Sequence, residues 1–312
     1  MSMPRFPRPD PHPSLFSSAE KRALYCRDVY FISAWIDLQG RRSNLTTTLW
    51  PLASVIIKPD AFAARAATRV PALLAESGFR PLGAVPFRFD HHCVRESLRY
   101  ILIDPDLERL AAIDAVLTAG ESLYVLLRDT TEHEGPATVR LSSLKGSTRD
   151  GAPLTPDKLR ARLGARGSLL NFIHVADDPG DLVREIGLLF DDSARGSLLD
   201  ILCAPDTQAD LATVVGRMEE AAAHHDFEWR DALVRVRHAA AVAHAPAVIK
   251  LLDRLPSPDV SWHDLHQALR HGHVRFDPWD AATVAAHLVG ERVGAEEVAL
   301  WEARAHATYP PA

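Results

Sequence analysis

The sequence predicts an α+β protein, in which a ferredoxin-like β-α-β-β-α-β sheet with inserted helices is followed by an all-α C-terminal region. Strand and helix patterns alternate between residues 50 and 195, and strand patterns disappear after Gly196. With 312 residues, 47% of them hydrophobic and 24% charged, the chain has room for one large or two ordinary globular domains. These observations favour a sheet domain at 50–195 and a helical domain of unknown role at 196–312.

Two segments precede the sheet domain. Residues 1–15 contain five prolines and are expected to form a disordered lead, without the apolar core of a signal peptide. Residues 16–49 are expected to form a helical extension. In this extension a helix begins near Ser18, where Ser17 or Ser18 can cap it, and continues to Trp35, and a polar loop covers 39–48.

The elements of the sheet domain follow from periodicity and from helix boundary residues. Leu52–Ile57 is an apolar run typical of a buried strand, and the alanine-rich helix after it ends at Gly78. Pro136 and Pro156 each stand at a first helical position, where proline is tolerated. The expected strands are 52–57, 79–89, 122–127 and 169–175, and the expected helices are 61–77, 91–102, 107–118, 136–143, 156–163 and 179–190.

The C-terminal region shows helical periodicity alone, with prolines and glycines at the breaks. The pair His263 and His266 shares a helix face, but no nearby cysteine completes a metal site, and we interpret these histidines as surface residues. The expected helices are 206–225, 229–255, 262–270, 280–289 and 295–306.

Charge and cysteine usage exclude several classes of protein. A net charge of −6 argues against a broad nucleic-acid surface, and no apolar run is long enough to span a membrane. Three cysteines, odd in number and widely spaced, fit a reduced, cytoplasmic compartment. The heavy use of alanine, arginine and aspartate is typical of a GC-rich bacterial genome.

Glycine-rich phosphate loops are missing from the sequence, so a phosphate site would need side-chain cations. The sheet domain supplies several of these cations: Lys58, Arg140, Arg160, Arg162 and Arg166.

Two motifs, more than a hundred residues apart, carry recognisable chemistry. Lys58-Pro59-Asp60 ends the first apolar strand, and His174 ends the last, three residues after Asn171 and three before Asp177. A neutral imidazole is a competent nucleophile near pH 7, because its pKa lies close by. In this order the motifs resemble the Lys-Pro-Asp and Asn-x-x-His-x-x-Asp signatures of nucleoside diphosphate kinases, over roughly residues 50–195.

The resemblance implies a phosphohistidine enzyme. His174 would take the γ-phosphoryl group of an NTP and pass it to a nucleoside diphosphate, with Mg²⁺ held mainly by the nucleotide phosphates. Glu185, eleven residues later, would hold His174 in one tautomer. Asn171 would contact the nucleotide, Asp177 would support the site, and Lys58 would reach the phosphates and ribose. Looser matches assign phosphate binding to Arg140, to Arg160 (with Arg162 as a substitute), and to Thr148 or Ser147, and place Tyr100 beside the histidine.

The sequence also departs from the family pattern. Val175-Ala176-Asp177-Asp178 stands where the family has Gly-Ser-Asp-Ser, 104–107 replaces the segment whose aromatic ring stacks on the base, and 145–149 replaces the Thr-Asn-Pro loop. Tryptophans of the C-terminal region could supply another base platform: Trp229, Trp262 or Trp279. Two alternatives therefore stay open. The acceptor could be a small metabolite or a protein, or the domain could be a nucleotide-binding or interaction module without turnover. Family members are usually hexamers or tetramers, but the extra regions leave a homo-oligomer as an open expectation here.

Overall fold

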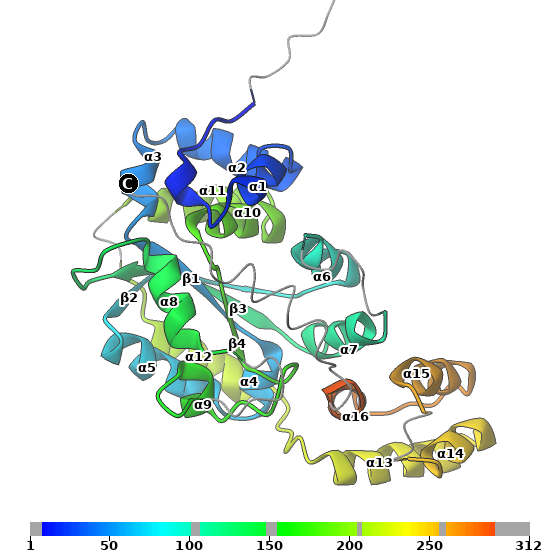
Figure 1. Cartoon of the computed structure of the whole chain (residues 1–312). Coiled ribbons are helices and arrows are strands. Elements are labelled where there is room, and N and C mark those ends of the chain that lie inside the picture. The colour runs from blue at the N-terminus through cyan, green and yellow to red at the C-terminus, as the bar shows by residue number, and fades with distance from the viewer. Residues whose placement is uncertain (1–7, 101–106, 148–154, 205–207, 256–259, 291–312) are drawn as a thin grey trace, which may run out of the picture.

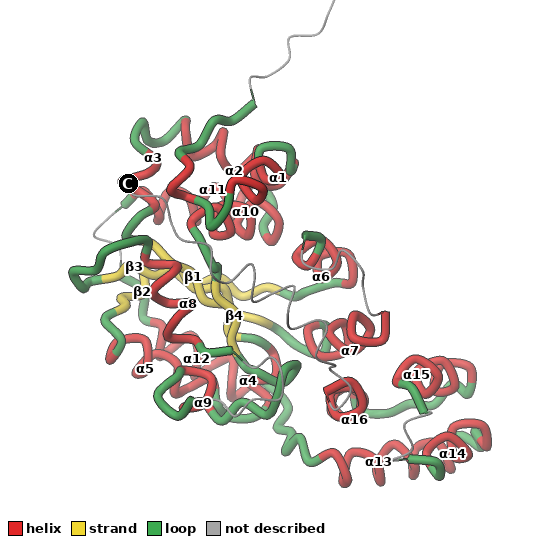
Figure 2. The backbone as a smooth tube through the Cα atoms, in the orientation of Figure 1, coloured by secondary structure: helices red, strands yellow, loops and turns green. Residues whose placement is uncertain are grey.

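The structure is a computed structural model that describes residues 8–100, 107–147, 155–204, 208–255 and 260–290 (Figure 1). Four strands form one sheet with helices on both faces, and a further group of helices lies beyond one end of the sheet (Figure 2). Within the described ranges, no helix combines the length and the apolar character needed to cross a lipid bilayer.

The sheet confirms the predicted fold class. Its strands are β1 (Leu52–Ile57), β2 (Phe79–Phe87), β3 (Ser122–Asp129) and β4 (Ile173–Val175). Their spatial order is β2-β3-β1-β4, and every neighbouring pair is antiparallel. This is the order of a ferredoxin-like sheet, in which the first and third strands are central. Because β1 is central and covered on both faces, all six of its residues are buried.

Short helices connect and cover the strands. Before and between the strands lie η1 (Pro13–Leu15), α1 (Ala19–Tyr25), α2 (Val29–Gln39), α3 (Leu45–Leu49), α4 (Pro59–Ala63), η2 (Ala67–Arg69), α5 (Val70–Glu76), α6 (His91–Leu98), α7 (Leu107–Leu117), α8 (Ala137–Lys145) and α9 (Leu159–Leu163). After β4 lie α10 (Pro179–Leu189), α11 (Asp192–Cys203), α12 (Leu211–Ala221), α13 (Trp229–Val242), α14 (Pro246–Leu252), α15 (Trp262–His271) and α16 (Pro278–Gly290).

The two faces of the sheet carry separate hydrophobic cores. On one face, α1, α2, α10 and α11 bury side chains such as Phe31 and Ile186 against β1 and β3. On the other face, α4, α5, α8, α9 and α12 bury side chains such as Leu141 and Val215. Helix α11 extends across residue 196 and α12 lies beyond it, so both cores include residues on each side of that position. The division of the chain into domains at 196 stays a prediction.

The remaining C-terminal helices form a third core. Helices α13, α14, α15 and α16 pack together and against α7, around the buried residues Val236, Trp262 and Val284. Leu169, from the loop that precedes β4, joins this core. The loop that leads to His174 is therefore supported from outside the sheet.

The N-terminal lead differs from its prediction. Residues 1–7 lie outside the described ranges, but 8–15 are not disordered: Pro13–Leu15 form a turn of 3-10 helix. Leu15 and Phe16 are each only 1% exposed, against the face that carries α10. The prolines exclude a regular α-helix, but they do not prevent burial of the two apolar residues that follow them.

One predicted helix is interrupted, and one predicted loop contains the start of a helix. The helix expected to run from Ser18 to Trp35 is split because the buried Asp28 carboxylate accepts the N–H groups of Tyr30 and Phe31 and so caps a second helix. The polar loop predicted at 39–48 contains the start of α3, which Asn44 caps.

Longer predicted helices break at residues with left-handed backbone angles. Arg65 has φ 58° and ends the helix predicted at 61–77 after one turn, and His244 has φ 52° and divides the helix predicted at 229–255. Helix α11, capped by Asp191, was not predicted. The predicted helix at 295–306 lies outside the described residues.

The N-terminal extension packs closely against α10, and two glycines allow this approach. A Cβ on Gly187 would lie 2.1 Å from the backbone oxygen of Tyr30, and a Cβ on Gly180 would lie 2.4 Å from the ring of Phe16. The two glycines are seven residues apart, so they lie on one face of the helix. The carboxylates of the first turn of α10 also bind the extension, as described below.

Candidate active site

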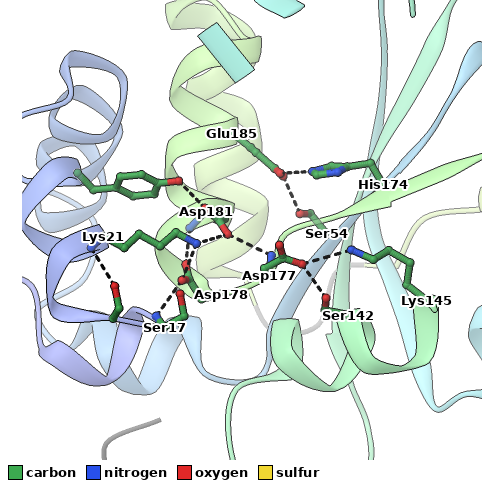
Figure 3. Close-up of polar contacts among 12 residues, drawn as sticks. Ser17, Lys21, Ser54, Ser142, Lys145, His174, Asp177, Asp178, Asp181 and Glu185 are labelled. Carbon is green, nitrogen blue, oxygen red and sulfur yellow. Dashed lines mark hydrogen bonds and ion pairs between the residues drawn. The ribbon is translucent and has the colours of Figure 1, made fainter. Parts of the chain in front are cut away.

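The candidate site is built around His174 in the middle of β4. In this strand Ile173 and Val175 are buried in the core of one face, while His174 points to the opposite face with 46% of its side chain exposed. Its Nε2 lies 2.7 Å from Oε1 of Glu185 on α10, as Figure 3 shows. Ser54 of β1 donates to the other carboxylate oxygen of Glu185 at 3.1 Å. A proton on Nε2, shared with the carboxylate, leaves the lone pair on Nδ1.

The turn that precedes His174 is held in an unfavourable backbone conformation. Phe172 has φ 66° although it is a bulky residue that is only 1% exposed. Such a conformation costs about 1–3 kcal/mol and persists only when its surroundings enforce it. Here Asp60 Oδ2 accepts the N–H of Phe172 at 3.1 Å, and the carbonyl of Phe172 accepts the N–H of Lys58 at 2.8 Å. The two sequence motifs thus meet, and the first fixes the backbone of the second.

Lys58 lies inside this turn and is only 7% exposed. Its Nζ donates to the side-chain oxygen of Asn171 at 2.8 Å and to the carbonyl of Leu169 at 2.9 Å, and lies 3.4 Å from Asp60. Burial, together with repulsion from Arg160, lowers the pKa of Lys58, although Asp60 opposes the shift. Asn171 in turn donates to the carbonyl of Ser168 at 2.7 Å. Lys58 and Asn171 are therefore brought together as a clamp on the loop before His174.

Asp177 lies on the other side of the histidine, where the chain enters α10. Its carboxylate accepts from Ser142 Oγ at 2.6 Å and pairs with Lys145 Nζ at 3.2 Å, both on α8. Burial alone would raise the pKa of Asp177. However, attraction by Lys145, the hydrogen bond from Ser142 and attraction by His174 together hold this pKa below its ordinary range. Asp177 is thus close enough to His174 to interact with it electrostatically.

Of the two arginines considered for the second phosphate position, Arg160 is the one beside His174. Its guanidinium donates twice to the carbonyl of Ile173, from Nη2 at 2.8 Å and from Nε at 3.2 Å, and once to Gly146. The substitute, Arg162, pairs with Glu76 on α5 at 2.6 Å. A buried guanidinium next to the backbone of the histidine is positioned to add positive charge to the site.

Arg140 is directed elsewhere. It pairs with Asp129 at the end of β3 at 2.9 Å and lies over the ring of Phe79 at 4.7 Å. A helix turns about 100° per residue, so Arg140 and Ser142 lie on opposite sides of α8, whereas Ser142 and Lys145 share a side. Lys145 therefore lies on the side of α8 that meets Asp177, while Arg140 ties β2 and β3 together.

Tyr100, another loosely matched position, makes its described contacts with residues other than His174. Tyr100 donates to Asp28 at 2.9 Å and lies against the guanidinium of Arg184, next to the N-terminal extension. Thr148 falls outside the described residues. Of the tryptophans considered as a base platform, Trp262 and Trp279 are buried in helical cores, and Trp229 stacks on His287.

Sequence reasoning missed four residues of this arrangement: Ser54, Ser142, Lys145 and Lys21. Ser54 is the one polar residue of the β1 run, and Ser142 and Lys145 have the spacing of a shared helix face, so these three left a readable signal. Lys21 left none, because it comes to the site from the N-terminal extension, 160 residues before its partner Asp181.

Comparisons with known proteins give structural neighbours only. No protein-family model matches the chain, and no curated protein matches it. Similar solved structures include a nucleoside diphosphate kinase of Aquifex aeolicus (20% identity, 46% of this chain and 96% of that one, TM-score 0.38). They also include one of Halobacterium salinarum in complex with CDP (23%, 53% and 97%, 0.40) and one of Encephalitozoon cuniculi (18%, 46% and 91%, 0.39). All three are members of the family whose motifs the sequence resembles.

Proposed function

We propose that this protein is a nucleotide-dependent phosphotransferase that carries a phosphoryl group on His174. The γ-phosphoryl group of an NTP would move to His174 and then to a nucleoside diphosphate. The observation that carries the proposal is the 2.7 Å contact between His174 Nε2 and Glu185, on a histidine whose side chain is 46% exposed. This contact directs Nδ1 as the nucleophile and leaves the ring accessible to a large substrate.

The proposed reaction has two balanced steps. In the first, the lone pair of Nδ1 attacks the γ-phosphorus, and the bond from phosphorus to the β,γ-bridging oxygen breaks, so that the NDP leaves with that electron pair. The ring then bears a positive charge, which the Glu185 carboxylate stabilises through the Nε2 proton. In the second, a terminal phosphate oxygen of the acceptor attacks the phosphorus, and the bond to Nδ1 breaks. Glu185 keeps its hydrogen bond throughout, so His174 needs no change of tautomer.

Cations around His174 support the transfer of a charged group. Phosphoryl transfer depends on positioning and on neutralisation of the transferring oxygens. Arg160 lies against the backbone of Ile173, and Lys145 reaches the carboxylate that follows His174. Among the described residues no group of three or more His, Cys, Asp or Glu side chains is placed to hold a metal ion. Mg²⁺ belongs to the proposal as a companion of the nucleotide, held mainly by its phosphates.

Labelling with γ-³²P-ATP and magnesium tests the proposal. Wild-type protein should take up an acid-labile, alkali-stable label, and His174→Ala should take up none. The chain has 15 histidines, so a matched control is needed. His92→Ala, an exposed histidine on α6, should keep the label. Wild-type protein without label, or His174→Ala with it, would contradict a phosphoryl carrier at this position.

A chase of the labelled protein distinguishes the acceptors. Rapid loss of the label to a panel of nucleoside diphosphates, with formation of labelled NTP, supports the nucleoside diphosphate kinase reaction. Label that is stable to all NDPs assigns the acceptor to another class, such as a small metabolite or a protein. A nucleotide that binds without any labelling would identify a binding module instead.

A further inference from the structure

The start of α10 carries an unusual amount of negative charge for a site that accepts a polyphosphate. Asp177, Asp178, Asp181 and Glu185 lie within nine residues, and three of them are in the turn and first helical turn after His174. A helix N-terminus stabilises carboxylates. The same carboxylates would repel an incoming triphosphate unless cations neutralise them. Lys145 on α8 pairs with Asp177. The carboxylates of Asp178 and Asp181 need a cation from another element.

The ammonium of Lys21, on the N-terminal extension, contacts both carboxylates and offsets one of their two negative charges. Its Nζ lies 2.7 Å from Asp178 Oδ2 and 2.5 Å from Asp181 Oδ2, with 21% of the side chain exposed (Figure 3). Burial alone would lower the pKa of Lys21, but attraction by the two carboxylates raises it, so the ammonium stays charged. The backbone N–H of Ser17 donates to Asp178 at 2.9 Å, and the hydroxyl of Tyr25 donates to Asp181 at 2.5 Å.

One carboxylate oxygen connects Lys21 to the turn beside the nucleophile. Asp181 Oδ2 accepts from Lys21 Nζ and also from the backbone N–H of Asp177, at 3.2 Å. The side chain of Asp177 holds Ser142 and Lys145 on α8. Lys21, Asp181, Asp177 and Lys145 are thus linked by two ion pairs and one backbone hydrogen bond, from the N-terminal extension to α8 (Figure 3).

We infer that Ser17, Lys21 and Tyr25, the residues of the N-terminal extension that contact the start of α10, belong to the active site, and that Lys21 is a positioning residue of the phosphoryl transfer. By pairing with Asp178 and Asp181 and offsetting part of their negative charge, Lys21 makes the start of α10 compatible with a polyphosphate and fixes the turn that carries Asp177. The inference rests on the proposed function, since it assigns Lys21 to binding of the triphosphate and assigns His174 to the chemistry.

Lys21→Met tests the inference through the split between KM and kcat. We expect the KM for the NTP and the Kd for a non-hydrolysable ATP analogue to rise about tenfold, or about 1.4 kcal/mol, while kcat changes by less than about threefold. Since the effect is electrostatic, the defect should shrink in about 0.5 M salt compared with about 0.05 M. Arg22→Met is the matched control, because Arg22 lies on the same helix and contacts Asp10 and Pro11 rather than α10. It should bind like wild type.

Rescue variants separate charge from mere packing. Lys21→Arg should bind the analogue within about threefold of wild type, because a guanidinium can pair with the same carboxylates. Lys21→Met combined with Asp181→Asn should also recover, because the net charge of the Lys21, Asp178 and Asp181 cluster returns to its wild-type value and the amide oxygen can still accept from Asp177. A double variant that stays as weak as Lys21→Met would overturn the inference, and so would a Lys21→Met variant that binds like wild type.

If Lys21→Met does not fold, Asp181→Asn alone replaces it, and it should tighten binding of the analogue; weaker binding would contradict the inference. The two proposals also fail in different ways. Wild-type protein that binds the analogue with the expected dependence on Lys21, but never forms phosphohistidine, contradicts only the proposed function. Phosphohistidine formation with a KM that ignores Lys21 contradicts only the inference.

Discussion

At the scale of single residues, the proposed chemistry depends on how Glu185 holds His174. Glu185 is 15% exposed and its two oxygens are both used, one by His174 and one by Ser54. In the proposed reaction the carboxylate would do two things: it would select the nitrogen that attacks, and it would stabilise the positive ring that forms when Nδ1 is phosphorylated. These two roles can be separated, because glutamine retains the shape and the acceptor oxygen but loses the charge.

Glu185→Gln should therefore slow phosphohistidine formation by about 100-fold, within the range of contributions from charged general-acid and general-base partners. Ser54→Ala should cost much less, about fivefold, because it removes one hydrogen bond worth about 1 kcal/mol. Single-turnover labelling with γ-³²P-ATP measures both rates. Equal rates for Glu185→Gln and wild type would show that the contact only holds the ring in place.

At the scale of elements, α10 is the helix that joins the parts of the site. One side of it carries Glu185 toward β4, and another side carries Gly180 and Gly187 toward the N-terminal extension. The two glycines differ in what a methyl group would meet. At Gly180 the obstacle is the ring of Phe16, a side chain that can rotate, whereas at Gly187 it is the backbone of Tyr30.

Gly187→Ala is thus predicted to destabilise the protein by about 3 kcal/mol or more, as expected for overpacking against rigid backbone, and Gly180→Ala by about 1–2 kcal/mol. Gly216→Ala on α12 is the matched control, because nothing lies within 4 Å of its added Cβ. It should stabilise the protein by about 1 kcal/mol through helix propensity. Urea denaturation measures all three free energies of unfolding. The same cost at positions 180 and 187 would contradict this explanation.

Elements were predictable from the sequence where local pattern decides them. Periodicity and helix caps predicted the four strands, α7 and α10, and the order of strands and helices along the chain indicated the ferredoxin-like sheet. The motifs predicted which residues meet at the site: His174, Glu185, Lys58 and Asn171. Tertiary contacts decided the rest. Strand β4 begins only at Ile173, because Phe172 is forced to a positive φ by Asp60 and Lys58. The role of Arg140 in phosphate binding stays a prediction. Its pairing with Asp129 could not be read from the sequence, because Asp129 lies on another element that sequence spacing does not bring near.

At the scale of the whole molecule, the charged contacts of α10 make stability depend on pH. Asp178 is fully buried and its pKa is raised to about 6, because of burial and repulsion by Asp181, which Lys21 only partly offsets. A raised pKa in the folded state means that protonation favours folding. The contribution of this carboxyl is complete below its ordinary value near 4 and is lost as the pH rises through 6.

The wild-type protein should therefore lose stability relative to Asp178→Asn between about pH 4 and pH 6, by up to about 3 kcal/mol. Asparagine also caps helices, so the substitution leaves the start of α10 formed. Urea denaturation of both proteins over this pH range measures the difference. Asp200→Asn, an exposed residue of α11, serves as a control. A difference that is constant across the range would contradict a raised pKa for Asp178.

The docking of the N-terminal extension on α10 also determines when the protein can fold during its synthesis. Lys21 and Asp181 are 160 residues apart, and Ser17 and Asp178 are 161 apart. At roughly 5–20 residues per second, a ribosome needs about 8–32 s to make the intervening chain. For that time Leu15, Phe16 and Phe31 have been synthesised but their partner helix has not. The N-terminal extension is thus unable to bury these apolar side chains against α10 until β4 and α10 have left the ribosome.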